Sequence, residues 1–206
     1  MTHTLNRTGL ANARSGEEIV ILGMVHYRYK EKSVEAMREL VRTILKYNPE
    51  NFVGLPLGLS KEDAIALVPR GGVATAVFTD KEIVGKLVRE IKGKNLGISV
   101  VLSGLYSDIR EICEDAGLGE HTTNYSVGIF GKTSLLPEHL TLDITTQCGH
   151  GLVSSHYIQD IVRRIGKGKL TAKEGAELLS KPCVCGIVNR KRTEEILLRM
   201  ASIAHE

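Results

Sequence analysis

Short β-rich runs alternate with amphipathic helical segments from Glu18 to Gly131. The apolar residues of the helical segments recur every three or four positions, as on one face of a helix. This alternation is typical of a layered fold in which helices cover a sheet. We therefore predict an α/β (or α+β) fold, with a mixed sheet, flanking helices and a helical C-terminal segment.

The predicted elements follow from these patterns. Strands are predicted at residues 19–24, 75–78, 97–102 and 125–130, with a last possible strand at 140–144. Helices are predicted at residues 33–47, 60–68, 81–91, 106–116, 153–165, 172–179 and 193–203. The run 52–58 holds two glycines and a proline, which favours a loop or an irregular edge strand. The strand and helix order resembles half of a doubly wound sheet or a ferredoxin-like unit.

Three regions differ in character. Residues 1–17 are polar and predict a flexible tail, residues 18–131 predict an α/β domain, and residues 132–206 predict a mainly helical, cysteine-containing region. The hydrophobic fraction of 42% and the charged fraction of 25% are those of a globular protein. Because the chain has no Trp and few other aromatic residues, we expect a core of Val, Ile, Leu and Ala.

The apolar runs of the chain are all strand-sized. None approaches the roughly eighteen residues of a membrane span, and residues 1–17 hold no signal-peptide core. We therefore expect a cytoplasmic protein with no membrane partner. In that reducing compartment, clustered cysteines are more often metal ligands or redox groups than disulfides.

Positive charge gathers toward the C-terminal end. Residues 151–206 carry ten Lys or Arg and six Asp or Glu, a balance of +4, which leaves 17 minus 18, or −1, for residues 1–150. A basic face of this kind can meet an acidic protein partner or a small anionic ligand, or it is a solvated helix surface. The net charge of +3 is too small to argue for nucleic acid, which we do not expect as a partner.

Three of the four cysteines lie in two glycine-flanked clusters. These are Cys148-Gly-His150-Gly and Cys183-Val-Cys185-Gly. Glycine next to a ligand removes the Cβ clash and lets backbone amides point at sulfur. The helix predicted after the first cluster adds its positive end, which favours a thiolate at Cys148. The layout predicts a metal or iron–sulfur site built from Cys148, Cys183 and Cys185, with His150 as a further ligand.

Two kinds of site fit these donors. An iron–sulfur cluster, for example of the 4Fe–4S type, would take three cysteines, and His150, an external group or a substrate would complete it. A Cys₃His zinc site is the main competitor, although the one-residue spacers depart from the usual two to four. Thiol redox chemistry and plain burial of small side chains remain as alternatives. Cys113 shares a predicted helix face with Ile109 and Ile112, which favours a core position.

Polar residues beside the first cluster are candidates for binding or catalysis. Asp143 could act as a general base, and Thr145 and Thr146 could line a substrate. A hydrogen-bonded turn explains the same residues equally well.

Two further sites are candidates for an anion or substrate. His121 lies in a loop before a predicted strand and could face a pocket at the sheet edge. Arg190, Lys191 and Arg192 stand where the last helix begins, and positive charge at that end favours a counter-anion.

Several common signatures are missing, including a Walker loop, a Gly-x-Gly-x-x-Gly turn and a Cys-x-x-Cys motif. The runs 145–154 and 181–189 are similar to segments of proteins from anaerobic archaea and bacteria, which implies oxygen-sensitive chemistry. We expect an iron–sulfur or other metal-binding protein of anaerobic metabolism, acting on a small anionic substrate or in cofactor or metalloenzyme maturation. The alternative is a non-catalytic assembly or regulatory protein with a structural zinc site and a basic partner-binding face.

Overall fold

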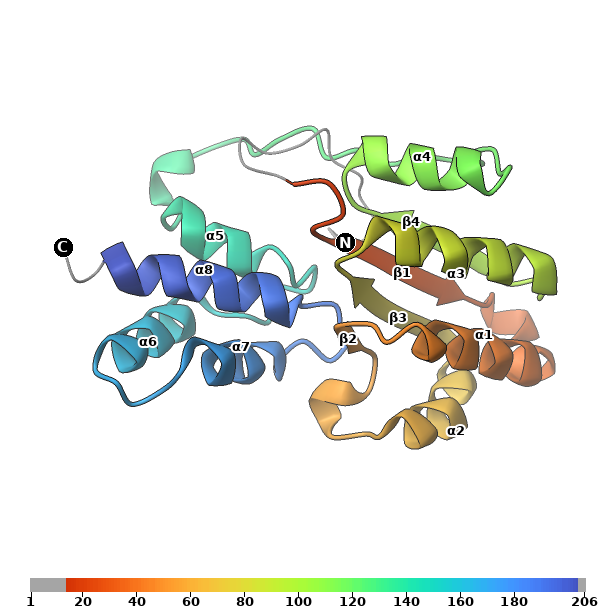
Figure 1. Cartoon of the computed structure of the whole chain (residues 1–206), viewed down its shortest axis with the longest axis horizontal. Helices are drawn as coiled ribbons and strands as arrows, with labels where there is room; N and C mark the ends of the chain where they lie inside the picture. The colour runs from red at the N-terminus through yellow and green to blue at the C-terminus, as the bar shows by residue number, and fades with distance from the viewer. Residues whose placement is uncertain (1–13, 204–206) are drawn as a thin grey trace.

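A four-stranded sheet in the order β2-β3-β1-β4 forms the centre of the protein in a computed structural model that describes residues 14–203 (Figure 1). The strands are β1 (Ile19–Met24), β2 (Asn51–Phe52), β3 (Val73–Phe78) and β4 (Ser99–Ser103). The predicted class, a sheet with flanking helices and a helical C-terminal segment, is confirmed. All three strand pairs of this sheet are antiparallel, so α+β is the apt description and the parallel doubly wound interpretation is wrong.

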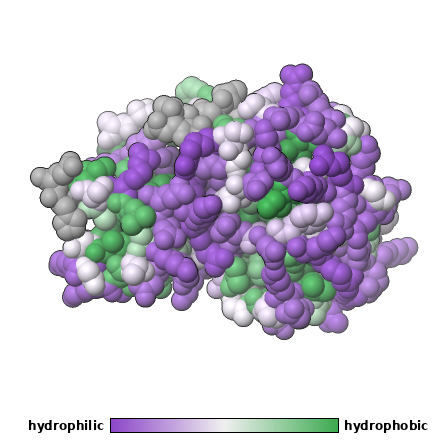
Figure 2. All heavy atoms as spheres, in the orientation of Figure 1, coloured by the Kyte–Doolittle hydropathy of each residue, from purple (hydrophilic) through white to green (hydrophobic). Residues whose placement is uncertain are grey.

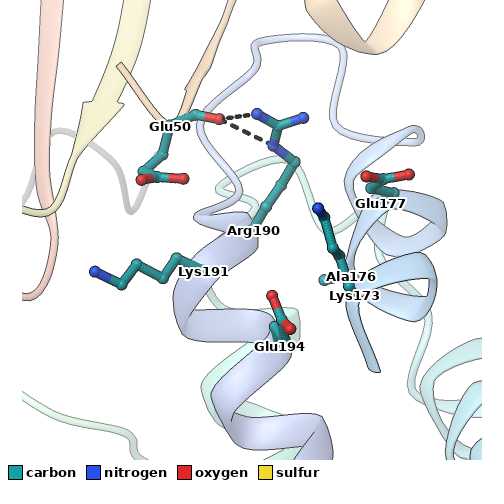
Figure 3. Close-up of a pocket in the computed structure, with 7 residues that line it drawn as sticks. All are labelled: Glu50, Lys173, Ala176, Glu177, Arg190, Lys191 and Glu194. Atoms are coloured by element: carbon teal, nitrogen blue, oxygen red, sulfur yellow. Dashed lines mark hydrogen bonds between the residues drawn. The ribbon is translucent and has the colours of Figure 1, made fainter. Parts of the chain in front are cut away.

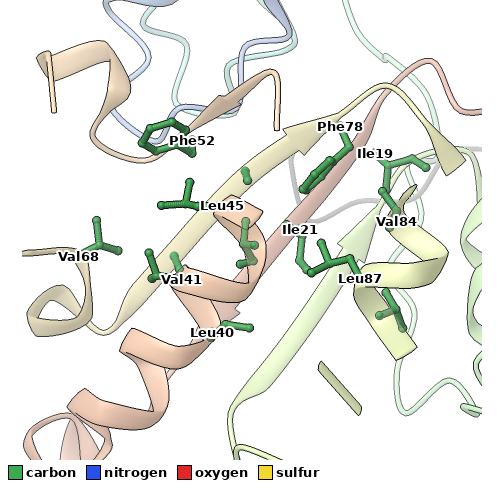
Figure 4. Close-up of a cluster of buried hydrophobic side chains, with 14 of the residues drawn as sticks. Ile19, Ile21, Leu40, Val41, Leu45, Phe52, Val68, Phe78, Val84 and Leu87 are labelled. Carbon is green, nitrogen blue, oxygen red and sulfur yellow. The ribbon is translucent and has the colours of Figure 1, made fainter. Parts of the chain in front are cut away.

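One face of the sheet carries the larger core. Ile19 pairs with Phe78 and Ile21 with Ala76, so these four side chains share a face. The helices α1 (Val34–Lys46), α2 (Lys61–Gly71), α3 (Lys81–Lys94) and α4 (Tyr106–Asp115) pack their apolar residues against this face (Figure 4). The apolar spacing of α1 puts Met37, Leu40, Val41 and Ile44 into this core, which explains its stability as a helix.

The opposite face meets the C-terminal helices. These are α5 (His139–Thr145), α6 (Ser155–Gly166), α7 (Ala172–Ser180) and α8 (Arg190–Ile203), gathered beside one end of the sheet (Figure 1). Their apolar residues form a second core that includes Val20 of β1 and Val77 of β3. Cys148 and Cys183 belong to this second core.

Two predicted strands are absent. Residues 125–130 form no strand but an exposed segment, in which Val127 is 81% and Phe130 78% exposed. Residues 140–144 lie in α5, where Thr141 and Ile144 are buried three positions apart. The short apolar pattern of residues 140–144 is compatible with a strand or a helix. The helix forms because it buries Thr141 and Ile144 on one face.

The connections contain short 3₁₀ helices: η2 (Tyr27–Tyr29), η3 (Glu31–Ser33), η4 (Leu55–Leu57) and η5 (Thr133–Leu135). Residues 1–13 of the predicted tail lie outside the described residues. The end of that tail is held, because Ser15 Oγ and the amide of Gly16 donate hydrogen bonds to Asp108. The predicted domain boundary at 131/132 falls in the loop between α4 and α5 and stays a prediction.

The face of the molecule shown in Figure 2 is mainly polar. Hydrophilic residues dominate the face shown in Figure 2, and hydrophobic residues appear there in separate patches. None of the helices within residues 14–203 has the length and apolarity needed to cross a bilayer.

Candidate metal centre

The two cysteine clusters form two turns of the same kind. The amide of Gly151 donates to the carbonyl of Cys148 at 3.0 Å, and the amide of Gly186 donates to the carbonyl of Cys183 at 2.9 Å. Each turn closes on a glycine with positive φ, 67° at Gly151 and 63° at Gly186. Each turn therefore carries two possible ligands, at its first and third positions.

The two turns bring these ligands together in pairs. The first positions meet, because the thiols of Cys148 and Cys183 lie close enough for each to shift the pKa of the other. The third positions also meet, because Cys185 Sγ lies 3.4 Å from His150 Nδ1. The first pair is buried, Cys185 is half-buried and His150 is exposed. The site thus runs from a buried pair of thiols to an imidazole at the surface.

Hydrogen bonds, burial and charge shift the pKa values of the three thiols. The Cys183 thiol donates to Cys148 and, together with the amides of Leu152 and His150, lowers the pKa of Cys148 to about 5 despite burial. The same bond and burial raise the pKa of Cys183. Burial, followed by the negative charge on Cys148, raises the pKa of Cys185. The pKa of Cys148 is therefore the lowest of the three.

The sheet positions the second turn through hydrogen bonds. Thr75 of β3 donates its hydroxyl to the carbonyl of Cys185. Asn51 of β2 donates from Nδ2 to the carbonyl of Val188 at 2.9 Å. The edge strand β2 and its neighbour β3 thereby hold the backbone on both sides of Gly186.

Gly186 also touches β2 directly. A Cβ atom at this position would lie 1.9 Å from the carbonyl oxygen of Phe52. No real Cβ makes so short a contact with backbone, so only glycine fits here. The glycine that the sequence places after Cys185 is thus needed for two reasons, its positive φ and its contact with β2.

The first turn is tied to α8. Gln147, which precedes Cys148, accepts a hydrogen bond at Oε1 from the amide of Asn189 at 2.8 Å. Asn189 then accepts from the amide of Arg192 and caps α8. The sequence gives no local signal that Asn51 or Thr75 supports the site, because each acts on a residue far along the chain.

Asp143, Thr145 and Thr146 make contacts within α5. Asp143 Oδ2 lies 3.3 Å from Nδ1 of His139, one helical turn away. The hydroxyls of Thr145 and Thr146 donate to the carbonyl of Leu142 at 3.2 Å and 2.7 Å. Within residues 14–203 no hydrogen bond joins Asp143 or Thr145 to the three cysteines. Their catalytic and substrate-binding roles stay predictions.

Two of the three basic residues at the start of α8 bind groups of the chain itself. Arg190 Nε donates to the carbonyl of Glu50 at 2.9 Å. Arg192 is largely buried, and its guanidinium pairs with Glu17 and Glu18. Lys191 is exposed, so the prediction of an external anion rests mainly on this residue. His121 is exposed in the loop between α4 and α5, and its predicted role also stays untested.

A pocket of about 380 Å³ lies beside the start of α8 (Figure 3). It is lined by Glu50, Lys173, Ala176, Glu177, Arg190, Lys191 and Glu194. Its three basic and three acidic side chains balance, so charge alone does not select an anionic ligand.

The four donors do not yet form a closed ligand set. Within residues 14–203, no three or more His, Cys, Asp or Glu side chains gather closely enough to hold a metal ion. The donors stand as two adjacent pairs instead. A metal would have to draw the two pairs together.

Comparison with known proteins adds no assignment. The chain matches no protein-family model, and neither a curated protein nor a solved structure is significantly similar to it.

Proposed function

We propose that the protein binds a single metal ion, zinc before others, through Cys148, His150, Cys183 and Cys185. The observation that carries this proposal is the pair of matching turns, whose donors meet first to first and third to third. Zinc binds sulfur at about 2.3 Å and imidazole nitrogen at about 2.0–2.1 Å in a tetrahedron, which separates neighbouring S and N ligands by about 3.5 Å. The Sγ–Nδ1 distance between Cys185 and His150 is 3.4 Å.

The pairing also answers the objection from sequence spacing. The spacer between the two ligands of each turn is one residue, which is shorter than in a usual zinc knuckle, where one turn binds the metal through both of its ligands. Here each turn supplies two donors on one side, and the partner turn supplies the other two. To close the site, the two pairs would have to approach each other.

An iron–sulfur cluster is the second candidate, favoured by the three cysteines. In a cluster, several irons and sulfides separate the thiolate ligands. The thiols of Cys148 and Cys183 lie close enough to shift each other's pKa, so the turns would have to move apart to admit a cluster. This contact supports a single ion over a cluster.

A four-ligand ion suits a structural role better than catalysis, because it leaves no open coordination position. It would join the segment after α5 to the segment before α8, and through Thr75 it would hold both against the sheet. We therefore favour a non-catalytic assembly or regulatory protein whose basic C-terminal surface meets an acidic partner. The charge-balanced pocket gives little support to the alternative of an enzyme for a small anionic substrate.

The test is a metal and acid-labile sulfide analysis of protein purified without oxygen. We expect about one zinc per chain and no sulfide, and we expect Cys183→Ser and Cys185→Ser to lose most of the metal. Cys113→Ser is the matched control, because Cys113 lies in the other core and should leave the metal content unchanged.

Three results would contradict the proposal. Iron together with sulfide would indicate that the site holds an iron–sulfur cluster and not a single ion. Equal metal content in the wild type and all three variants would show that the metal does not bind at this site. Protein without metal that forms a Cys148–Cys183 disulfide would assign the pair to thiol redox chemistry.

A further inference from the structure

Two tyrosines stand exposed on one turn at the end of β1. Tyr27 is 72% and Tyr29 59% exposed, and no residue of η2 is buried. The whole chain has only nine aromatic residues, six Tyr and three Phe, so two in a single solvated turn is a notable concentration. These rings contribute nothing to either core.

Local contacts hold the rings in place. The ring centroids of His26 and Tyr27 lie 4.5 Å apart, and those of His26 and Tyr29 lie 6.0 Å apart. Arg28 lies 5.7 Å from the Tyr27 ring centroid, and its Nε donates to the Tyr27 hydroxyl at 3.1 Å. The backbone is fixed as well, because His26 Nδ1 accepts from the amide of Arg28. The turn thus offers ordered aromatic faces to a partner, at low entropic cost.

The same turn is basic. Arg28, Lys30 and Lys32 are exposed, and Glu31 is the one acidic residue among residues 26–32. The stem of Lys30 lies against Gly72, two residues after the exposed Arg70. In the described part of the chain, no ion pair is recorded for these four cations or for Glu31. The surface therefore presents a local charge of about +3 that an anionic partner would complement.

We infer that residues 26–32, with Arg70, form a binding surface for single-stranded nucleic acid, which we name the aromatic–basic turn. Single strands combine phosphates with unstacked bases, and proteins bind them by pairing cations with aromatic stacking platforms. An acidic peptide would satisfy the charges but leave the rings without a flat partner. The small net charge of the whole chain argued against nucleic acid, but a short strand meets only the local charge.

The experiment measures fluorescence anisotropy of a labelled oligothymidylate of about 12 nucleotides with the full chain, over a series of salt concentrations. We expect Tyr27→Ala with Tyr29→Ala to weaken binding roughly 10-fold or more, with little change in the salt slope. Tyr27→Phe with Tyr29→Phe should retain most of the affinity, because the stacking faces remain. This rescue separates stacking from loss of the tyrosine hydroxyls.

Charge is tested separately. The double variant Arg28→Gln with Lys30→Gln should make the slope of log affinity against log salt concentration less steep by about 1.4. Each phosphate contact to a single strand contributes about 0.7 to this slope. Lys86→Gln with Arg89→Gln on the surface of α3 is the matched control and should leave both affinity and slope unchanged.

Several outcomes would overturn the inference. One is no binding at low salt, and another is equal affinity in the wild type and the tyrosine-to-alanine variant. If a duplex bound more tightly than the single strand, contacts with the phosphates alone would explain the binding. Displacement of the oligonucleotide from this turn by an equal concentration of polyglutamate would identify an acidic protein as the partner.

Discussion

Gly186 packs the turn of Cys183 and Cys185 closely against the sheet. Alanine there would combine the strain of a positive φ, 63°, with a Cβ 1.9 Å from the carbonyl oxygen of Phe52. We expect Gly186→Ala to lower the free energy of unfolding by about 3 kcal/mol or more. Urea denaturation of the purified variant measures this loss.

Gly151 provides the control at the same position of the other turn. Its φ is 67°, but nothing lies within 4 Å of the place where its Cβ would stand. Gly151→Ala should therefore cost only about 1 kcal/mol, the strain of the left-handed backbone. If the two variants lost the same stability, close packing against β2 would not be the reason for glycine at 186.

At the scale of elements, β2 is the link between the sheet and the C-terminal region. Its Asn51 is buried, donates from Nδ2 to the carbonyl of Val188 at 2.9 Å and accepts at Oδ1 from the amide of Phe52. Asn51→Ala removes the donor to a carbonyl that has no access to water. We expect a loss of about 1–3 kcal/mol in unfolding free energy, together with weaker metal retention although every ligand remains. Denaturation and metal analysis of one preparation measure both effects.

Asn124→Ala is the control for that change, because Asn124 lies exposed in the loop between α4 and α5. It should match the wild type in both measurements. Wild-type stability in Asn51→Ala would show that β2 does not hold the C-terminal region in this way.

The elements also show what a sequence can predict. Helix α1 and strand β1 were predicted nearly to their ends, because their apolar spacing is a local property. The strand at 125–130 was wrong, since alternation shows that a segment can pair but not that a sheet edge is available to it. The cysteines and their glycines were visible in the same local way. Their pairing depends on Thr75 and Phe52, about a hundred positions earlier, so no local pattern could reveal it.

The stability of the whole molecule without metal should depend on pH. In the folded protein the pKa of Cys148 is about 5, below its ordinary value of 9.0. Between these two pH values the unfolded chain binds one proton more than the folded chain, so stability should rise with pH and be lost as pH falls through about 5. The raised pKa of Cys183 acts in the opposite sense, and stability should fall again above about 9.

Urea unfolding of chelator-treated protein from about pH 5 to 10 tests this dependence. Cys148→Ser should remove the rise below pH 9, whereas Cys113→Ser should keep it. A wild-type curve that is flat across this range would mean that Cys148 is not a thiolate in the folded protein.

The position of β1 in the sheet affects how the chain reaches its fold. Met24 pairs with both Val73 and Ser99, so the earliest strand has to wait for partners about 50 and 75 residues further on. Closing such distant contacts is slow, and folding should take longer than the high helix content suggests. Until then the apolar run Ile19–Met24 stays uncovered in the nascent chain, where it can associate with other chains. A strand that is buried between two others in the folded protein is thus exposed to association with other chains during synthesis.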